Sequence, residues 1–457
     1  MKTLRALLLG SAAVVAASTG ANAADMMMDV KAPREPVYRC DITGFIELPG
    51  TDICFKVGGF AALTLYAYED QWDPAVGAAY GIVPDGHTLN DTFGMYGYGR
   101  INFDARTSTE YGTVRAFVEL QAYDNDTRTG GSADLRHAFV QFGNWTFGKT
   151  WSTFLHLDSS PVYSDFVTVT GDNYIRRNQI RYTQSFGSGF TLMVALEDQE
   201  YDYPYAMNAQ GVYFTPPGAN FVVNDRSSMP DVVAAIRFEG DWGNAQLSGA
   251  VHQNEFREVN GAGMAPAPLP GNQTDDEFGW AVLFGTYIDT PMTGEGDYFT
   301  FKAMYTDGAT QYNQDNFLGS ANPVWGLCNW LVPALGGCIV DTVTTWSVLA
   351  SYTHNWSPTI ASTFGAGYQN VDAPLTRLDL FTFSGASNFE MDTYEFFGNV
   401  SWTPVNNLTF LFDLHYGHVD FNGAGTFLGV FDPFFANPFA KDDEGAFGFG
   451  IDITRTF

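Results

Sequence analysis

Asp413 and His415 stand two residues apart in a segment where apolar and polar residues alternate, so both belong to the polar face of a predicted strand. A carboxylate beside an imidazole is a pair that general-base hydrolysis uses. No nucleophile can be named for it, because none of the seven histidines lies in a Gly-x-Ser-x-Gly or His-Glu-x-x-His context. We therefore favour a hydrogen-bonded structural pair and keep a hydrolytic centre as the alternative. The sequence predicts no cofactor and no metal site.

Other charged residues suggest an electrostatic site. The stretch 152–175 contains Asp158, Asp165 and Asp172 but no Lys or Arg, whereas basic residues lie in alternating segments on either side. A basic side chain that faces lipid near mid-membrane costs about 2–4 kcal/mol, so basic residues of membrane-crossing strands should face inward. Opposed charges across a narrow passage would then create a transverse field; the alternative is solvated loop aspartates and ordinary cross-strand pairs. The basic residues are Arg100, Arg106, Arg115, Lys149, Arg176, Arg177 and Arg181.

The segments that must position these residues have the pattern of β-strands. Between Ile101 and Leu120, apolar residues alternate with polar ones on both sides of the turn 109–112, which predicts a hairpin with one apolar face. Gly, Pro and Asn mark further tight turns, and long polar segments lie between them. The strands that flank the long segments number about sixteen. The turns are 143–144, 187–189, 240–243, 357–358 and 404–407, and the long segments are roughly 69–92, 124–133, 152–175, 200–229, 253–276, 307–342, 371–389 and 419–443.

This organisation is typical of an all-β fold, a transmembrane antiparallel β-barrel with short periplasmic turns and long extracellular loops. The last segment alternates Phe447, Phe449 and Ile451 with glycines and ends on Phe457, an aromatic residue suited to the membrane interface. We expect almost no helix beyond a turn within a loop. Residues 53–457 should form the barrel and residues 24–52 a lead-in segment. A soluble secreted β-protein is the alternative.

The N-terminus predicts export. Lys2 and Arg5 precede an apolar run over residues 6–17, and Ala21-Asn22-Ala23 forms a small-x-small cleavage site. Residues 1–23 are therefore expected to be a cleaved signal peptide, and a barrel that follows it belongs in a Gram-negative outer membrane. The formal charge of −29 argues against a nucleic-acid partner, because such a surface repels phosphates.

The four cysteines suggest disulfides, since an even number in an exported chain commonly forms them. The pairs Cys40–Cys54 and Cys328–Cys338 need the least chain closure, but sequence alone leaves the connectivity open. Zinc binding is the weaker alternative, because no Cys-x-x-Cys motif accompanies them.

Several motifs resemble those of a known family. The stretch 138–151, Ala-Phe-Val-Gln-Phe-Gly-Asn-Trp-Thr-Phe-Gly-Lys-Thr-Trp, resembles the strand that enters the constriction loop of Gram-negative porins, and 176–183 resembles its exit. Tyr38-Arg39-Cys40 and the Leu-Pro-Gly-Thr-Asp-Ile-Cys stretch at 48–54 are similar to the alphaproteobacterial, Rhizobiales-type porins. The likeness covers the whole chain, and Pro-Gly-Thr-x-x-Cys is its most specific part.

The resemblance implies a homotrimer of sixteen-stranded barrels, each with its third loop, about 152–175, folded inward. By motif position, Arg100, Lys149 and Arg177 match the basic wall best, and Arg176 could replace Arg177 by register. The segments 200–229 and 307–342 depart from the family, which leaves solute preference open.

The sequence therefore predicts a porin, not an enzyme, through which small hydrophilic solutes and ions diffuse passively. Its expected partners are outer-membrane lipid and lipopolysaccharide, and the barrel assembly machinery through Phe457. A substrate-specific channel and a surface adhesin or structural barrel are the alternatives.

Overall fold

The computed structural model describes residues 40, 42–68, 93–124, 132–166, 169–199, 220–225, 228–260, 275–313, 324–328, 338–373, 389–422 and 443–457. The predicted signal peptide lies outside these residues. Within them the chain is almost entirely β-structure, and its helical parts are two single turns, η2 (Leu157–Ser159) and η3 (Thr310–Tyr312). No helix in the described ranges is long and apolar enough to cross a membrane.

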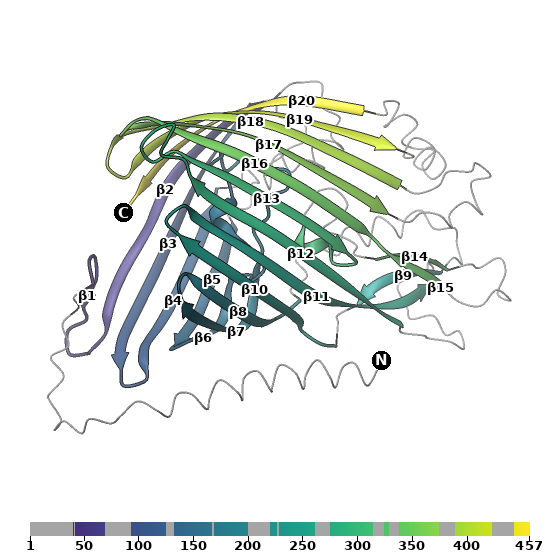
Figure 1. The fold of residues 1–457 in the computed structure, drawn as a ribbon, viewed down its shortest axis with the longest axis horizontal. Helices are drawn as coiled ribbons and strands as arrows, with labels where there is room; N and C mark the ends of the chain where they lie inside the picture. The colour runs from purple at the N-terminus through teal and green to yellow at the C-terminus, as the bar shows by residue number, and fades with distance from the viewer. Residues whose placement is uncertain are drawn as a thin grey trace.

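A closed ring of sixteen antiparallel strands forms the body of the molecule, which confirms the predicted fold and strand number (Figure 1). Each strand pairs with the next along the chain, and the last pairs with the first, so that Asp452 lies opposite Thr64. Ring closure leaves no unpaired sheet edge, which is what strands in lipid require. The strands of the ring are β2 (Cys54–Tyr68), β3 (Phe93–Thr109), β4 (Gly112–Tyr123), β5 (Ser132–Phe142), β6 (Trp145–Trp151), β7 (Arg176–Gly187), β8 (Phe190–Glu197), β10 (Asp231–Gly240), β11 (Gly243–Asn260), β12 (Asp275–Asp289), β13 (Tyr298–Asp307), β16 (Thr344–Ser357), β17 (Ile360–Ala373), β18 (Phe389–Val405), β19 (Leu408–Asn422) and β20 (Asp443–Thr456).

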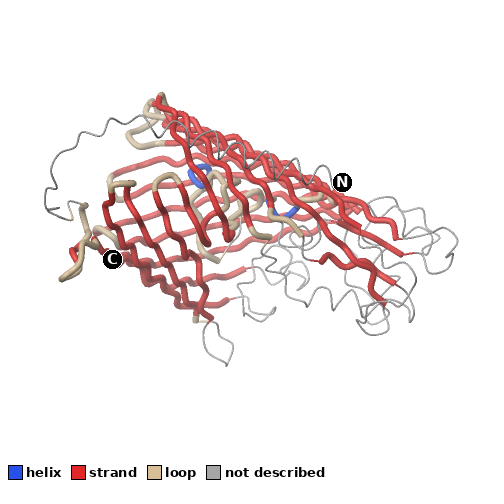
Figure 2. Tube along the Cα trace, turned by 90° about the horizontal axis from the view of Figure 1, so that it is seen from below, coloured by secondary structure: helices blue, strands red, loops and turns tan. Residues whose placement is uncertain are grey.

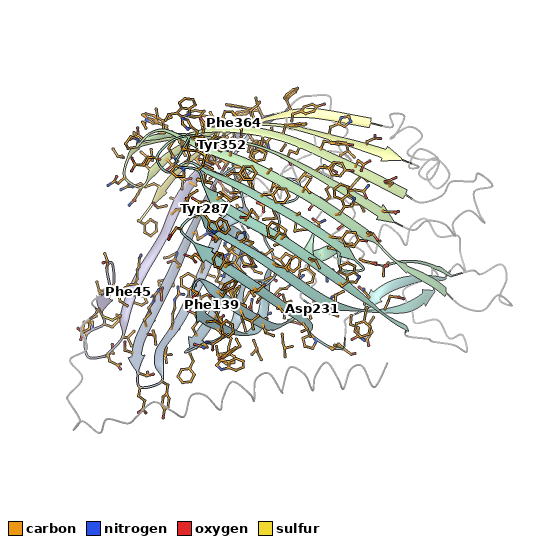
Figure 3. All side chains as sticks on the ribbon, viewed as in Figure 1. Phe45, Phe139, Asp231, Tyr287, Tyr352 and Phe364 are labelled. Atoms are coloured by element: carbon orange, nitrogen blue, oxygen red, sulfur yellow. A yellow bond between two sulfur atoms is a disulfide. The ribbon has the colours of Figure 1, made fainter. Side chains whose placement is uncertain are left out.

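Burial on the ring is the reverse of that in a soluble protein. Phe364, labelled in Figure 3, and Phe396 are each 57% exposed, whereas Thr64 and Lys302 on the inner face are at most 1% exposed. Alternation along each strand sends apolar side chains outward and polar ones inward. A water-soluble protein buries its apolar residues, so this outer face is suited to lipid.

Four further strands lie outside the ring, three of them in segments predicted to be loops. Strand β1 (Ile46–Glu47) pairs with β2 in the lead-in segment, while β9 (Asn220–Asp225) pairs with the far end of β11. Strands β14 (Val324–Cys328) and β15 (Cys338–Thr342) extend this small sheet. The 18 residues of β11 span about 60 Å at the usual rise per residue, so β11 is longer than the membrane is thick. The backbone N–H and C=O groups of its far end therefore need the hydrogen-bond partners that β9 supplies.

One disulfide, Cys40–Cys54, ties the lead-in segment to the first residue of β2. The ladder of β14 and β15 places Cys328 directly opposite Cys338. Opposed residues in an antiparallel pair have Cα atoms about 4.5–5.5 Å apart, within the range that a disulfide bridges.

We expect non-reducing peptide mapping to recover the pairs Cys40–Cys54 and Cys328–Cys338, because each links backbone segments that already lie together. Such bonds typically stabilise a fold by about 2–4 kcal/mol. The reduced and alkylated protein is the control. A Cys40–Cys338 peptide, or free thiols at Cys328 and Cys338, would contradict the second pairing.

Candidate functional site

The segment 152–175 leaves the wall after β6, enters the barrel and reaches the opposite wall. Three of its backbone N–H groups donate hydrogen bonds to carboxylates on β18, β19 and β20, which confirms the inward folding predicted from the family resemblance. Figure 2 shows the two helical turns, η2 within this segment and η3, in blue among the red strands. The bonds join Ser164 to Asp413 (2.6 Å), Asp165 to Asp452 (2.8 Å) and Thr170 to Glu395 (2.5 Å).

A fourth carboxylate holds the point where the loop departs. Glu197 on β8 is completely buried and accepts hydrogen bonds from the Ser152 hydroxyl (2.7 Å) and the Thr153 N–H (2.6 Å). Hydrogen bonds to a charged group are among the strongest in proteins, each contributing about 1.5–3 kcal/mol. The loop is thus fixed to the wall at its start as well as along its path.

A second segment, 308–313, also enters the lumen and packs on the loop. Tyr312 is completely buried, lies 4.8 Å from Phe154 between ring centroids and donates a hydrogen bond to Asp231 (2.7 Å; labelled in Figure 3). These residues belong to the long segment 307–342 that was predicted to be an external loop, and for 308–313 that prediction is wrong. The available signal was the uncharged run Gly-Ala-Thr-Gln-Tyr-Asn in a segment expected to be polar and acidic.

The Asp413–His415 pair supports the loop. His415 is 1% exposed, and its Nδ1 and Nε2 lie 2.8 Å from Glu395 and 2.9 Å from Asp413. These are the same carboxylates that accept the loop's N–H groups, so the imidazole links two anchors. The favoured interpretation of a structural pair therefore matches its place beneath the loop.

The three loop aspartates meet three different parts of the wall. Asp158 pairs with Arg237 on β10 (2.5 Å). Asp172, 1% exposed, pairs with Lys302 on β13, deep in the barrel. Asp165 is exposed to the lumen and accepts a hydrogen bond from the Tyr96 hydroxyl on β3 (3.3 Å). Asp165 is therefore the aspartate that faces the predicted basic wall.

Three arginines form the wall opposite Asp165, which we call the arginine cluster: Arg100, Arg136 and Arg176. Glu119 lies 3.5 Å from Arg100 and 3.2 Å from Arg136. Arg176 interacts electrostatically with both of the other arginines, and Asp165 with Arg100 and Arg136.

Arg136 was not predicted to line the lumen, because a β-bulge changes the face on which it lies. The register between β4 and β5 shifts between Glu119 and Leu120, so that Arg136 is an extra residue in β5. Its side chain reaches Glu119 on the inner face although Leu135 beside it is 43% exposed. The signal for the bulge was the break in alternation at Arg136-His137.

The remaining basic residues lie elsewhere. Arg106 and Arg115 both bind Asp104, at 2.7 and 2.9 Å, near the turn that joins β3 and β4. Arg177 is 6% exposed and interacts with Asp231, away from Asp165.

Arg181 and Lys149 also differ in position from the arginine cluster. Arg181 lies on the inner face of β7 and interacts with Glu197. Lys149 lies opposite Ala138 and Asn178 in the ladder and interacts electrostatically with His137. The best-match set Arg100, Lys149 and Arg177 stays a prediction: Arg100 interacts with Asp165, whereas Arg177 interacts with Asp231.

The pKa of Asp165 is raised to about 6. The chief cause is desolvation by the surrounding walls, and the negative charge of Asp452 adds to it, while Arg136 and Arg100 partly compensate. The charge that faces the arginine cluster thus changes in a range of pH that a cell surface can experience.

Comparison with known proteins agrees with this architecture. The family model described as "Porin subfamily" matches residues 25–444. Porin Omp2a of Brucella canis is 28% identical over 54% of this chain and 65% of its own length. Porin Omp2b of Brucella melitensis is 29% identical over 53% of this chain and 64% of its own length. The matched region thus spans slightly less than two thirds of these relatives.

The solved structure of the outer membrane channel DcaP of Acinetobacter baumannii has the same fold. It superimposes with a TM-score of 0.60 and 19% identity, covering 89% of this chain and 97% of that one. The lipid-compatible outer face and the family match are those of an outer-membrane protein. Because the family model covers nearly the whole chain, this protein belongs to the porin subfamily.

Proposed function

We propose that this barrel is a passive diffusion channel for small hydrophilic solutes and ions, and that it carries out no covalent chemistry. The observation that carries the proposal is the loop inside the barrel, whose anchoring to Asp452 brings Asp165 within electrostatic reach of Arg136 and Arg100. Opposed charges in a narrow, low-dielectric passage focus the field and favour polar over apolar solutes. No covalent step is needed for this function.

The test is reconstitution of folded, detergent-purified protein in planar bilayers. We expect discrete, long-lived conductance steps and swelling of liposomes in small sugars. A closed barrel resists SDS until it is boiled, so a heat-dependent gel shift selects folded material. Folded protein that gives no conductance would contradict the channel and favour an adhesin or structural barrel. Saturable uptake of one solute class with exclusion of similar-sized solutes would favour the substrate-specific alternative.

The proposed assembly is a homotrimer in outer-membrane lipid with lipopolysaccharide, after removal of a signal peptide at residues 1–23. Phe457, at the end of β20, is 64% exposed and exchanges backbone hydrogen bonds with Gly59 on β2 (3.2 and 3.0 Å). This exposed aromatic side chain at the closing seam supports the proposal that the assembly machinery recognises Phe457. Neither a cofactor nor a nucleic-acid partner is proposed.

A further inference from the structure

Arg176 is the arginine of the cluster that has no carboxylate partner among the described residues. Its guanidinium carbon lies 3.7 Å from the centre of the Trp151 ring, to which it is also paired across the ends of β6 and β7. Its buried Nε has no hydrogen-bond partner, and among the described residues no carboxylate lies within ion-pair distance of it. Arg100 and Arg136, in contrast, share Glu119.

The charges around Arg176 leave an excess of positive charge. Arg136 and Arg100 repel it, whereas Asp134 and Glu119 act on it only from beyond ion-pair distance. Three guanidinium groups thus stand against one closely placed carboxylate. A guanidinium is planar, and it binds a carboxylate through two parallel N–H bonds. One further carboxylate, bound through the two terminal Nη groups of Arg176, would balance the cluster.

Aromatic rings lie beside the arginine cluster. Tyr174, 38% exposed, lies 5.6 Å from Trp151 between ring centroids, and Tyr163 follows at 6.3 Å from Tyr174. On β3 and β4, the strands that carry Arg100 and Glu119, Tyr98 and Tyr123 stack at 5.6 Å. A fully hydrophilic solute would gain little from such rings, whereas a planar apolar body packs well against them.

We propose that Arg176 and Trp151 form a binding site for a small aromatic carboxylate in the constriction. The carboxylate pairs with the Arg176 guanidinium, and the ring of the solute packs among Trp151 and the tyrosines. Arg136 and Arg100 add attraction at longer range. This inference rests on the proposed channel function and gives it a preferred solute class.

The experiment measures block of KCl current by benzoate added to one side of a planar bilayer at low background salt. Acetate, benzyl alcohol and inorganic phosphate are the comparison solutes. We expect benzoate to block at lower concentration than all three, because only benzoate has both the charge and the ring. The KCl current in the same membrane reports the channel itself. A conducting channel that benzoate does not block, or that phosphate blocks equally well, would overturn the site and leave the proposed function standing.

Substitutions of Arg176 and Trp151 test whether these two residues form the benzoate site. Loss of a hydrogen-bonded charge partner typically weakens binding at least about 10-fold, so R176Q should raise the half-blocking benzoate concentration by that factor. R176K keeps the charge without the planar fork and should fall between. W151L should weaken block by benzoate more than block by acetate. The matched control is R106Q, which removes one arginine near the turn that joins β3 and β4 and outside the proposed site. Equal effects of R176Q and R106Q, or none from R176Q, would overturn the assignment.

Discussion

Replacing Lys302 with methionine is expected to displace the part of the loop around Asp172 and to raise the single-channel conductance. Lys302 and Asp172 are each at most 1% exposed and form an ion pair that joins the loop to β13. Removal of one partner leaves a buried charge without compensation, which typically costs about 3–5 kcal/mol. Asp172 is then expected to move toward water and to take the adjoining part of the loop with it.

The matched control is the double variant K302M/D172N. It removes both charges and keeps a side chain at position 172 that still accepts the hydrogen bond from Ser160 (2.8 Å). Replacing both members of a buried pair is often close to neutral, so the double variant should conduct nearly as the natural protein does. The conductance should be recorded in 1 M KCl. At that concentration the Debye length is about 3 Å, so the loss of a charge has little electrostatic effect on the conductance by itself. Unchanged conductance in K302M would show that this pair does not hold the loop.

Neutralising Asp165 is expected to move ion selectivity toward anions, and neutralising Arg136 toward cations. Both side chains face the same part of the lumen and interact electrostatically, so each loss leaves the opposite charge dominant. The measurement is the zero-current potential across a KCl gradient for D165N and R136Q. Shifts of the same sign, or no shift near 0.1 M salt, would contradict this charge pair as the filter.

The same carboxylate predicts a pH dependence. Because the pKa of Asp165 is raised to about 6, the group is ionised above that pH and neutral below it. The natural protein should therefore lose cation preference as the pH falls from 7 to 5, whereas D165N should not respond over this range. D158N is the matched control, since Asp158 belongs to the same loop but pairs with Arg237 on the other side.

The sequence by itself determined the barrel, its sixteen strands and the inward face of most polar residues. Lipid penalises polar side chains strongly enough to impose alternation on every strand, so that pattern is visible locally. At Arg136 the local pattern was insufficient, because one extra residue in β5 changes which face a side chain occupies.

Only the tertiary structure decided which charges meet. Asp172 and Lys302 are 130 residues apart, and Ser164 and Asp413 are 249 apart. Such partners depend on where the loop crosses the lumen, and no periodicity within the loop encodes that path. The inward course of 308–313 has the same cause, since its burial arises from packing against Phe154 on the first loop. Local sequence thus specified the wall, whereas contacts across the lumen specified the constriction.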